Sequence, residues 1–170
     1  GGATSNFTIG TGTDITLNAI ANGLNDFTTN RNITLGANLS LNGTLTLTAG
    51  VFTVGARTLT LNGPTIAGTP ENLVTIATSN LVFGGTTAGV SIPTSVVALS
   101  GLSITNTNIV SLQSSPTITG TFNPAGAGLS IGANTLTLNG QINCGTLIGG
   151  PTSNIIIGGA GTASLPGVTL

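Results

Sequence analysis

The stretch Ile131–Gly140, I-G-A-N-T-L-T-L-N-G, decides the fold, because two close copies of it occur earlier in the chain. Val54–Gly63 is V-G-A-R-T-L-T-L-N-G, and Leu35–Gly43 is L-G-A-N-L-S-L-N-G. In each copy leucine alternates with threonine or serine before an Asn-Gly pair, the pattern of a short half-buried strand followed by a turn. The sequence therefore predicts a protein built from β-strand repeats.

A longer repeat encloses these copies. The stretches Thr4–Gly10, Thr78–Gly84 and Thr152–Gly158 all begin Thr-Ser-Asn, and their starting positions are evenly spaced. We expect one repeat array over residues 1–170, with units of about 74 residues at 5–78, 79–152 and, incomplete, 153–170. The array is cut within a unit at both ends, so we expect either an excerpt of a longer array or end units that neighbouring molecules complete.

The strand candidates are too short and too closely spaced to form a wide sheet one after another. Those between Ile33 and Gly63 follow at intervals of about six to seven residues, and three of them with their corners make about 20 residues, the size of one solenoid coil. We predict an all-β fold, a right-handed parallel β-helix with apolar residues inward. Outward threonine, serine and asparagine would form ladders, and asparagine and glycine would take the corners because they tolerate positive φ.

An antiparallel β-sandwich of the pilin type is the alternative. Leu39–Leu47, L-S-L-N-G-T-L-T-L, is also a good signal for a hairpin with a two-residue type I′ turn. Three features favour the solenoid: the even spacing of the repeated landmarks, the near absence of charge, and asparagine or glycine at almost every corner.

Charged residues are rare, at 3% of the chain against roughly 25% in ordinary soluble domains. They are Asp14, Asp26, Arg31, Arg57 and Glu71. Neither a basic surface for nucleic acid nor an acidic surface for cations can be assembled from them. The apolar runs are too short for a membrane helix, and we expect a signal peptide to be absent or already removed.

The sequence lacks the residues of common catalytic sites. Without histidine there is no Ser-His or Cys-His pair, and only carboxylates could act as general acid or base. Asp14 and Asp26 could form a glycosidase-like pair across a coil, but we interpret them as solvated turn residues. Cys144 is expected to be a small buried residue, and the glycine pairs Gly84-Gly85 and Gly158-Gly159 are expected to be corners. We predict no catalytic, cofactor-binding or metal-binding residue.

Two surface features suggest modification or binding. Asn-x-Ser/Thr sequons, which are candidate glycosylation sites in a secreted protein, occur at Asn6, Asn32, Asn38 and Asn42. Outward threonine pairs, as in Thr58-Leu59-Thr60, raise the possibility of ice binding, which needs a T-x-T in every coil. Leu39-Ser40-Leu41 and Val74-Thr75-Ile76 break that pattern.

The units G-A-N-T-L-T-L-N-G and T-S-N-I-I-I-G-G-A-G-T resemble the Thr-, Asn- and Gly-rich repeat regions of very large secreted surface proteins of Bacteroidota and similar environmental bacteria. The resemblance implies an extracellular or cell-surface location, an adhesive or filamentous role and no catalysis. We expect a structural protein that forms or lengthens an extracellular filament or adhesin stalk by end-to-end stacking on itself. The alternatives are a surface module that binds ice or glycans, and a pilin-like subunit joined by strand donation.

Overall fold

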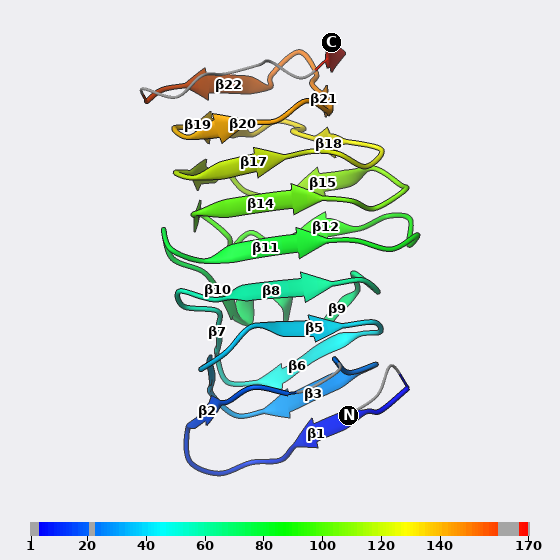
Figure 1. Ribbon diagram of the computed structural model, residues 1–170, viewed down its shortest axis with the longest axis vertical. Helices are drawn as coiled ribbons and strands as arrows, with labels where there is room; N and C mark the ends of the chain where they lie inside the picture. Colours follow the sequence, from blue (N-terminus) through cyan, green and yellow to red (C-terminus); the bar gives the residue numbers. More distant parts are fainter. Residues whose placement is uncertain (1–3, 21–22, 160–166, 170) are drawn as a thin grey trace.

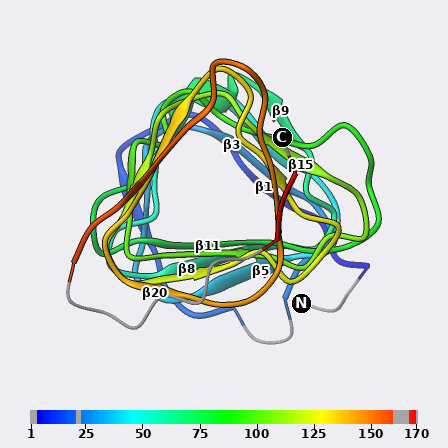
Figure 2. The same ribbon diagram turned by 90° about the horizontal axis from the view of Figure 1, so that it is seen from above.

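The computed structural model describes residues 4–20, 23–159 and 167–169. Regular structure in these residues is β-strand, apart from one short 3-10 helix, η1 (Pro70–Asn72). All of the strand pairs described are parallel. The strands wind into a β-solenoid of roughly seven turns with a triangular cross-section (Figure 1, Figure 2). The predicted parallel β-helix is confirmed.

Three faces make up the solenoid, and the chain passes over them in the order right, left and front. The front face, towards the viewer in Figure 1, is one sheet of six strands: β5 (Leu39–Leu41), β8 (Thr58–Leu61), β11 (Asn80–Phe83), β14 (Gly101–Ile104), β17 (Thr121–Asn123) and β20 (Gln141–Ile142). This is the one face on which the described ladder runs unbroken from the second turn up to β20.

The right face, on the right in Figure 2, is divided into two sheets. Its lower sheet contains β1 (Phe7–Ile9), β3 (Phe27–Asn30), β6 (Leu45–Ala49) and β9 (Ile66–Gly68). Its upper sheet contains β12 (Ser91–Ile92), β15 (Val110–Leu112), β18 (Leu129–Ser130), β21 (Thr146–Ile148) and β23 (Gly167–Thr169).

The left face is divided at the same height as the right face. Its lower sheet contains β2 (Ile15–Leu17), β4 (Ile33–Leu35), β7 (Phe52–Thr53) and β10 (Leu73–Val74). Its upper sheet contains β13 (Ala98–Leu99), β16 (Thr117–Ile118), β19 (Thr135–Leu138) and β22 (Asn154–Ile157).

The coil is right-handed and close to the predicted length. In Figure 1 the front strands run from left to right while the chain climbs from the N-terminus, which gives a right-handed path when viewed from above in Figure 2. Phe27 is in register with Leu45 on the next turn, and Leu59 is in register with Leu81. The second of these coils is longer than the first, and the difference falls in the turns, because the paired strands keep their register.

Columns of inward side chains fill the interior. One column follows the whole front face, one residue per turn: Leu39, Leu59, Leu81, Leu102, Phe122 and Ile142. Every member of this column is at most 4% exposed. Burial of such side chains stabilises by roughly 1.5–3 kcal/mol each, so the apolar period-2 pattern of each strand translates directly into a continuous core.

Copies of the long repeat do not stack on one another. The copy at Thr4–Gly10 contains β1 on the right face, the copy at Thr78–Gly84 contains β11 on the front face, and the copy at Thr152–Gly158 contains β22 on the left face. From one copy to the next, the chain therefore completes three coils and then passes on by two more faces. Sequence copies are therefore distributed around the solenoid instead of lying along one of its faces.

At the Asn-Gly corners of Gly43, Gly63 and Gly140 close stacking requires the glycine, and the explanation by positive φ is wrong there, whereas Gly23, which follows Asn22 in the sequence, does have a positive φ of 66°. Gly43, Gly63 and Gly140 are absent from the glycines with positive φ. A Cβ on Gly63 would collide with the carbonyl oxygen of Asn42, and one on Gly140 with that of Gly120. Neighbouring corners approach so closely that no side chain fits between them.

The hairpin alternative is wrong as well. The strands on either side of Asn42-Gly43 lie on different faces, β5 pairing with β8 and β6 pairing with β3 and β9. Because a type I′ turn needs positive φ at its central residues, the ordinary φ of Gly43 also excludes it. The antiparallel pilin-like sandwich is thereby contradicted.

Candidate functional site

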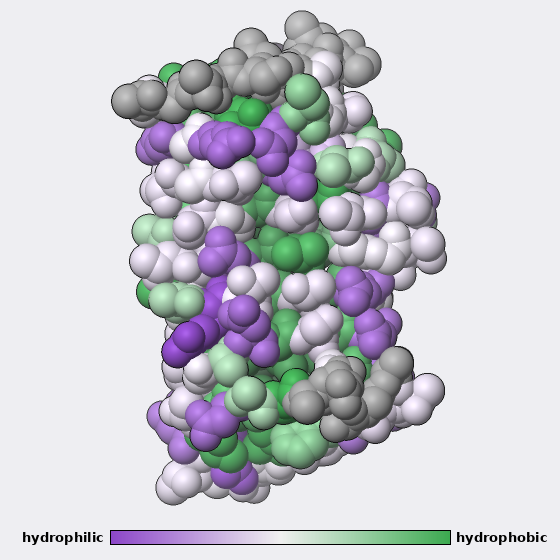
Figure 3. Space-filling model, viewed as in Figure 1, coloured by the Kyte–Doolittle hydropathy of each residue, from purple (hydrophilic) through white to green (hydrophobic). Residues whose placement is uncertain are grey.

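The front face carries the longest described sheet of the solenoid, and its surface is a mixture of near-neutral, hydrophilic and smaller hydrophobic areas (Figure 3). One outward column contains Ser40, Thr60, Val82, Ser103 and Asn123 in register. Hydrogen bonds join some side chains of neighbouring turns, as where Nδ2 of Asn123 donates to Oγ of Ser103 (3.4 Å). Hydroxyl and amide groups therefore face the solvent where other proteins carry charges.

The threonine pairs do not form the array that ice binding requires. The T-x-T at Thr44–Thr46 lies on the right face, the one at Thr58–Thr60 on the front face, and the one at Thr135–Thr137 on the left face. None of them stacks on another, because the long repeat rotates its copies around the axis. On the left face Thr117-Ile118-Thr119 and Thr135-Leu136-Thr137 lie on successive coils, but Thr117 is in register with Thr137, so the two pairs are offset by two residues. The described faces thus lack aligned T-x-T pairs in every coil.

All four sequon asparagines are exposed and link one turn to the next. The side-chain oxygen of each accepts a hydrogen bond from the following turn: Asn6 from Nδ2 of Asn25 (3.1 Å), Asn32 from the amide of Val51 (2.8 Å), Asn38 from the amide of Thr58 (2.9 Å) and Asn42 from Nδ2 of Asn62 (3.0 Å). These residues have a structural role at the corners, and their glycosylation stays a prediction.

Asp14 and Asp26 also lie at corners, on different faces. Asp14 precedes β2, and its Oδ1 accepts from Nδ2 of Asn32 (3.0 Å). Asp26 precedes β3, and its Oδ1 accepts from the amide of Thr44 (2.7 Å). Each carboxylate therefore hydrogen-bonds the next turn, and the structure does not bring the two together as a facing pair.

Other predicted features can be located directly. The glycine pairs Gly84-Gly85 and Gly158-Gly159 follow β11 and β22 at corners, as expected. The prediction of a buried Cys144 is wrong, because its side chain is exposed. The strand before it ends at Ile142, which takes the inward position, so Cys144 falls in the corner that follows.

Some classes of site are missing from the part of the chain that the structure describes. No three histidine, cysteine, aspartate or glutamate side chains cluster there as metal ligands would. No helix in those residues has the length and apolar character needed to cross a bilayer.

Apolar side chains are exposed on the lowest and highest described turns. Phe7 is in register with the fully buried Phe27 and stacks on its ring with centroids 5.8 Å apart, yet Phe7 is 41% exposed. Ile157 is in register with Leu138, which is 1% exposed, yet Ile157 is 45% exposed. In both places no strand of the described residues lies over the inward position.

A hollow with a volume of about 570 Å³ lies on the right face, where the sheet is divided. Residues of β9 and its flanking segments line one side, and residues within 87–94 of the next turn, with Gln113 of the turn after that, line the other. This hollow was not predicted from the sequence. The one available signal was the grouping of Pro64, Pro70 and Pro93, since proline interrupts ladders.

Comparisons of the chain with protein-family models, with curated proteins and with solved structures found no match. The candidate sites therefore depend on the geometry described above: two end surfaces with exposed apolar side chains, a front face with outward hydroxyl and amide groups, and a hollow in the right face.

Proposed function

We propose that this chain is a structural repeat of an extracellular filament or adhesin stalk, which extends by stacking turn upon turn along the solenoid axis. The observation that carries the proposal is the exposure of inward side chains on the end turns, Phe7 below and Ile157 above. Covering them requires another parallel turn, and a second copy of the chain can supply one.

Backbone chemistry supports the same geometry. A parallel ladder leaves backbone hydrogen-bonding groups unpaired on the outer edges of its first and last strands, and exposed strand edges recruit other chains. The lower edge of β1 and the upper edge of β22 are such edges, since each strand is the last of its sheet. Axial growth would pair these edges and bury the apolar side chains in one step.

Surface composition also supports an assembled state. The net charge is −1 with five ionisable acidic or basic side chains in 170 residues, so long-range repulsion between copies is weak. The outward hydroxyl and amide groups hydrogen-bond from turn to turn and need no cofactor to do so. An extracellular location belongs to this proposal and is tested separately, by immunolabelling of intact cells.

The test is assembly of the purified full chain, followed by sedimentation velocity and negative-stain electron microscopy over a range of concentrations. We expect rods that lengthen with concentration at constant width. Phe7→Glu should shorten them, because a carboxylate would be buried at each junction. Ile109→Glu is the matched control, since Ile109 is 45% exposed on the side of the stack. Monodisperse particles with the mass of a single chain at every concentration would contradict the proposal.

A further inference from the structure

The right face is interrupted between β9 and β12. β9 is the last strand of the lower sheet and β12 the first of the upper sheet. Residues 64–69 and 86–94, all of them described, share no backbone hydrogen bond. The backbone N–H and C=O groups on the upper edge of β9 and on the lower edge of β12 therefore have no strand partner.

Proline explains why the chain does not close this gap. Pro64 precedes β9, Pro93 follows β12, and Pro70 begins η1. Each lacks the N–H that a ladder needs, and its ring occupies the space beside the strand. The break in the sheet is therefore caused by prolines in the two turns that border it.

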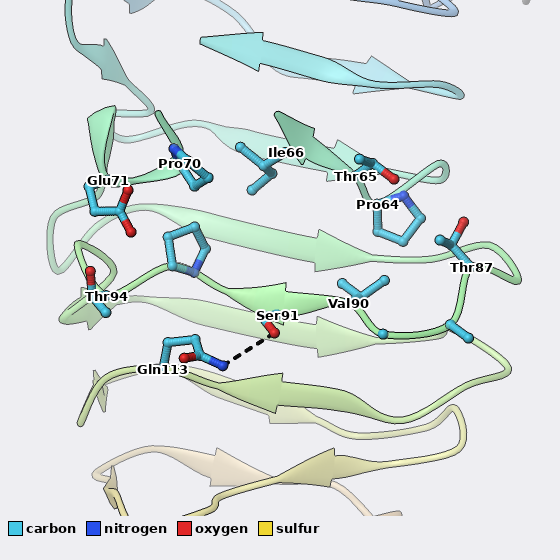
Figure 4. Close-up of a pocket in the computed structure, with 13 residues that line it drawn as sticks. Pro64, Thr65, Ile66, Pro70, Glu71, Thr87, Val90, Ser91, Thr94 and Gln113 are labelled. Atoms are coloured by element: carbon cyan, nitrogen blue, oxygen red, sulfur yellow. Dashed lines mark hydrogen bonds between the residues drawn. The ribbon is translucent and has the colours of Figure 1, made fainter. Parts of the chain in front are cut away.

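The residues that line the resulting hollow are spread along the direction of the strands (Figure 4). Ile66, Pro70 and Pro64 lie along one side, and Ser91 with Gln113 lies along the other, where Nε2 of Gln113 donates to Oγ of Ser91 (3.3 Å). Glu71 stands at one end of the hollow. It is the one charged residue in the lining.

The wall formed by the corner after β11 is held in place. Nδ2 of the fully buried Asn106 donates to the carbonyl of Thr87 (3.0 Å), and Nδ2 of Asn108 donates to the carbonyl of Thr86 (2.8 Å). Across the equivalent break of the left face, Oγ of Ser95 donates to the carbonyl of Leu73 (2.6 Å). These bonds keep the hollow open without a ladder across it.

We propose that this hollow binds an extended peptide segment carrying a basic side chain. Strand edges recognise peptide backbone by adding it to the sheet, and pockets beside the edge select the side chains. β9 and β12 offer two such edges along one hollow. Ile66 and Val90 would contact apolar side chains of the peptide, and the Glu71 carboxylate would pair with a lysine or arginine at one end.

The lining disfavours other ligands. No cationic or aromatic side chain lines the hollow, so an anion would meet only the Glu71 charge and a planar ring would find nothing to stack on. A volume of about 570 Å³ falls within the usual range of ligand sites. This site is independent of axial stacking, because its lining lies on the side of the solenoid.

The test is an NMR titration of the isotope-labelled full chain with a capped peptide of about six residues, Thr-Val-Thr-Val-Lys-Thr. We expect saturable shifts at the amides of Ile66, Gly68 and Ser91. A peptide with glutamate in place of lysine should bind roughly 2- to 5-fold more weakly, the range of an exposed ion pair. A peptide N-methylated at both valines should not bind, because its edge groups are blocked.

Glu71→Gln should abolish the preference for lysine over glutamate while keeping the shifts at Ile66 and Gly68. Asp14→Asn is the matched control, since it removes an exposed carboxylate on another face and should leave the preference intact. The proposal is overturned if the N-methylated peptide binds as well as the unmodified one, or if no peptide gives saturable shifts. It is also overturned if an amino sugar such as glucosamine gives saturable shifts of the Ile66, Gly68 and Ser91 amide signals and the peptides do not.

Discussion

Replacing Gly63 with alanine separates the stacked geometry from any account based on turn conformation. The φ of Gly63 lies outside the left-handed region, so alanine fits the local backbone. On local grounds Gly63→Ala should stabilise by about 0.4–1 kcal/mol, through the smaller entropy of the unfolded chain. In the solenoid, however, the added Cβ meets backbone atoms of Asn42 and Gly43 on the turn below.

Those atoms cannot rotate away as a side chain would, so the two turns must separate at this corner. Overpacking of this kind costs about 1–3 kcal/mol, and the net effect is a destabilisation of about 1–2 kcal/mol. For a chain of this length the melting temperature should fall by about 2–8 °C. Urea unfolding followed by far-UV circular dichroism measures the difference.

Gly10→Ala is the matched control, because its φ is also ordinary and a Cβ there meets no atom within 4 Å. We expect this variant to be neutral or slightly stabilised. If Gly63→Ala is as stable as Gly10→Ala, the close approach of neighbouring corners is refuted.

Three further substitutions test the interior and one corner. Thr75→Val should stabilise by about 1 kcal/mol in the same unfolding assay, because the buried hydroxyl of Thr75 has no hydrogen-bond partner; a loss of stability would show that the hydroxyl is satisfied. Leu81→Ala should cost about 2–5 kcal/mol, since Leu81 is 1% exposed in the middle of the front column; a change below about 1 kcal/mol would argue against that column. Arg31→Lys should speed amide hydrogen exchange over residues 10–13, because the guanidinium of Arg31 donates to the carbonyls of Gly10, Thr11 and Thr13; unchanged exchange would mean that these contacts do not order the loop.

The strands and the coil length were predictable because both depend on short-range patterns. The alternation in Thr58-Leu59-Thr60-Leu61 indicates which side chains point inward, and the observed burial follows it. A coil of about 20 residues follows from strand spacing alone. The observed register, which pairs Phe27 with Leu45 and Leu59 with Leu81, agrees with that length.

Features that depend on how turns meet could not be predicted. The glycine of an Asn-Gly pair looks the same in a hairpin and in a stacked corner, and only the approach of Gly63 to Asn42 separates them. Successive copies of the long repeat are rotated around the axis because three coils and two further faces, which is not a whole number of coils, separate them. The hollow beside Glu71 arises where prolines of two different turns, Pro64 before β9 and Pro93 after β12, border one break of the right face.

Methyl–methyl nuclear Overhauser contacts along the front column test the central claim, the parallel stacking of successive turns, most directly. Leu59, Leu81 and Leu102 are in register on adjacent strands, about 4.8 Å apart along the axis. The stacked fold predicts strong contacts from Leu81 to both Leu59 and Leu102. Contacts across the Asn42-Gly43 pair between the residues of β5 and β6, with none along the column, would contradict it.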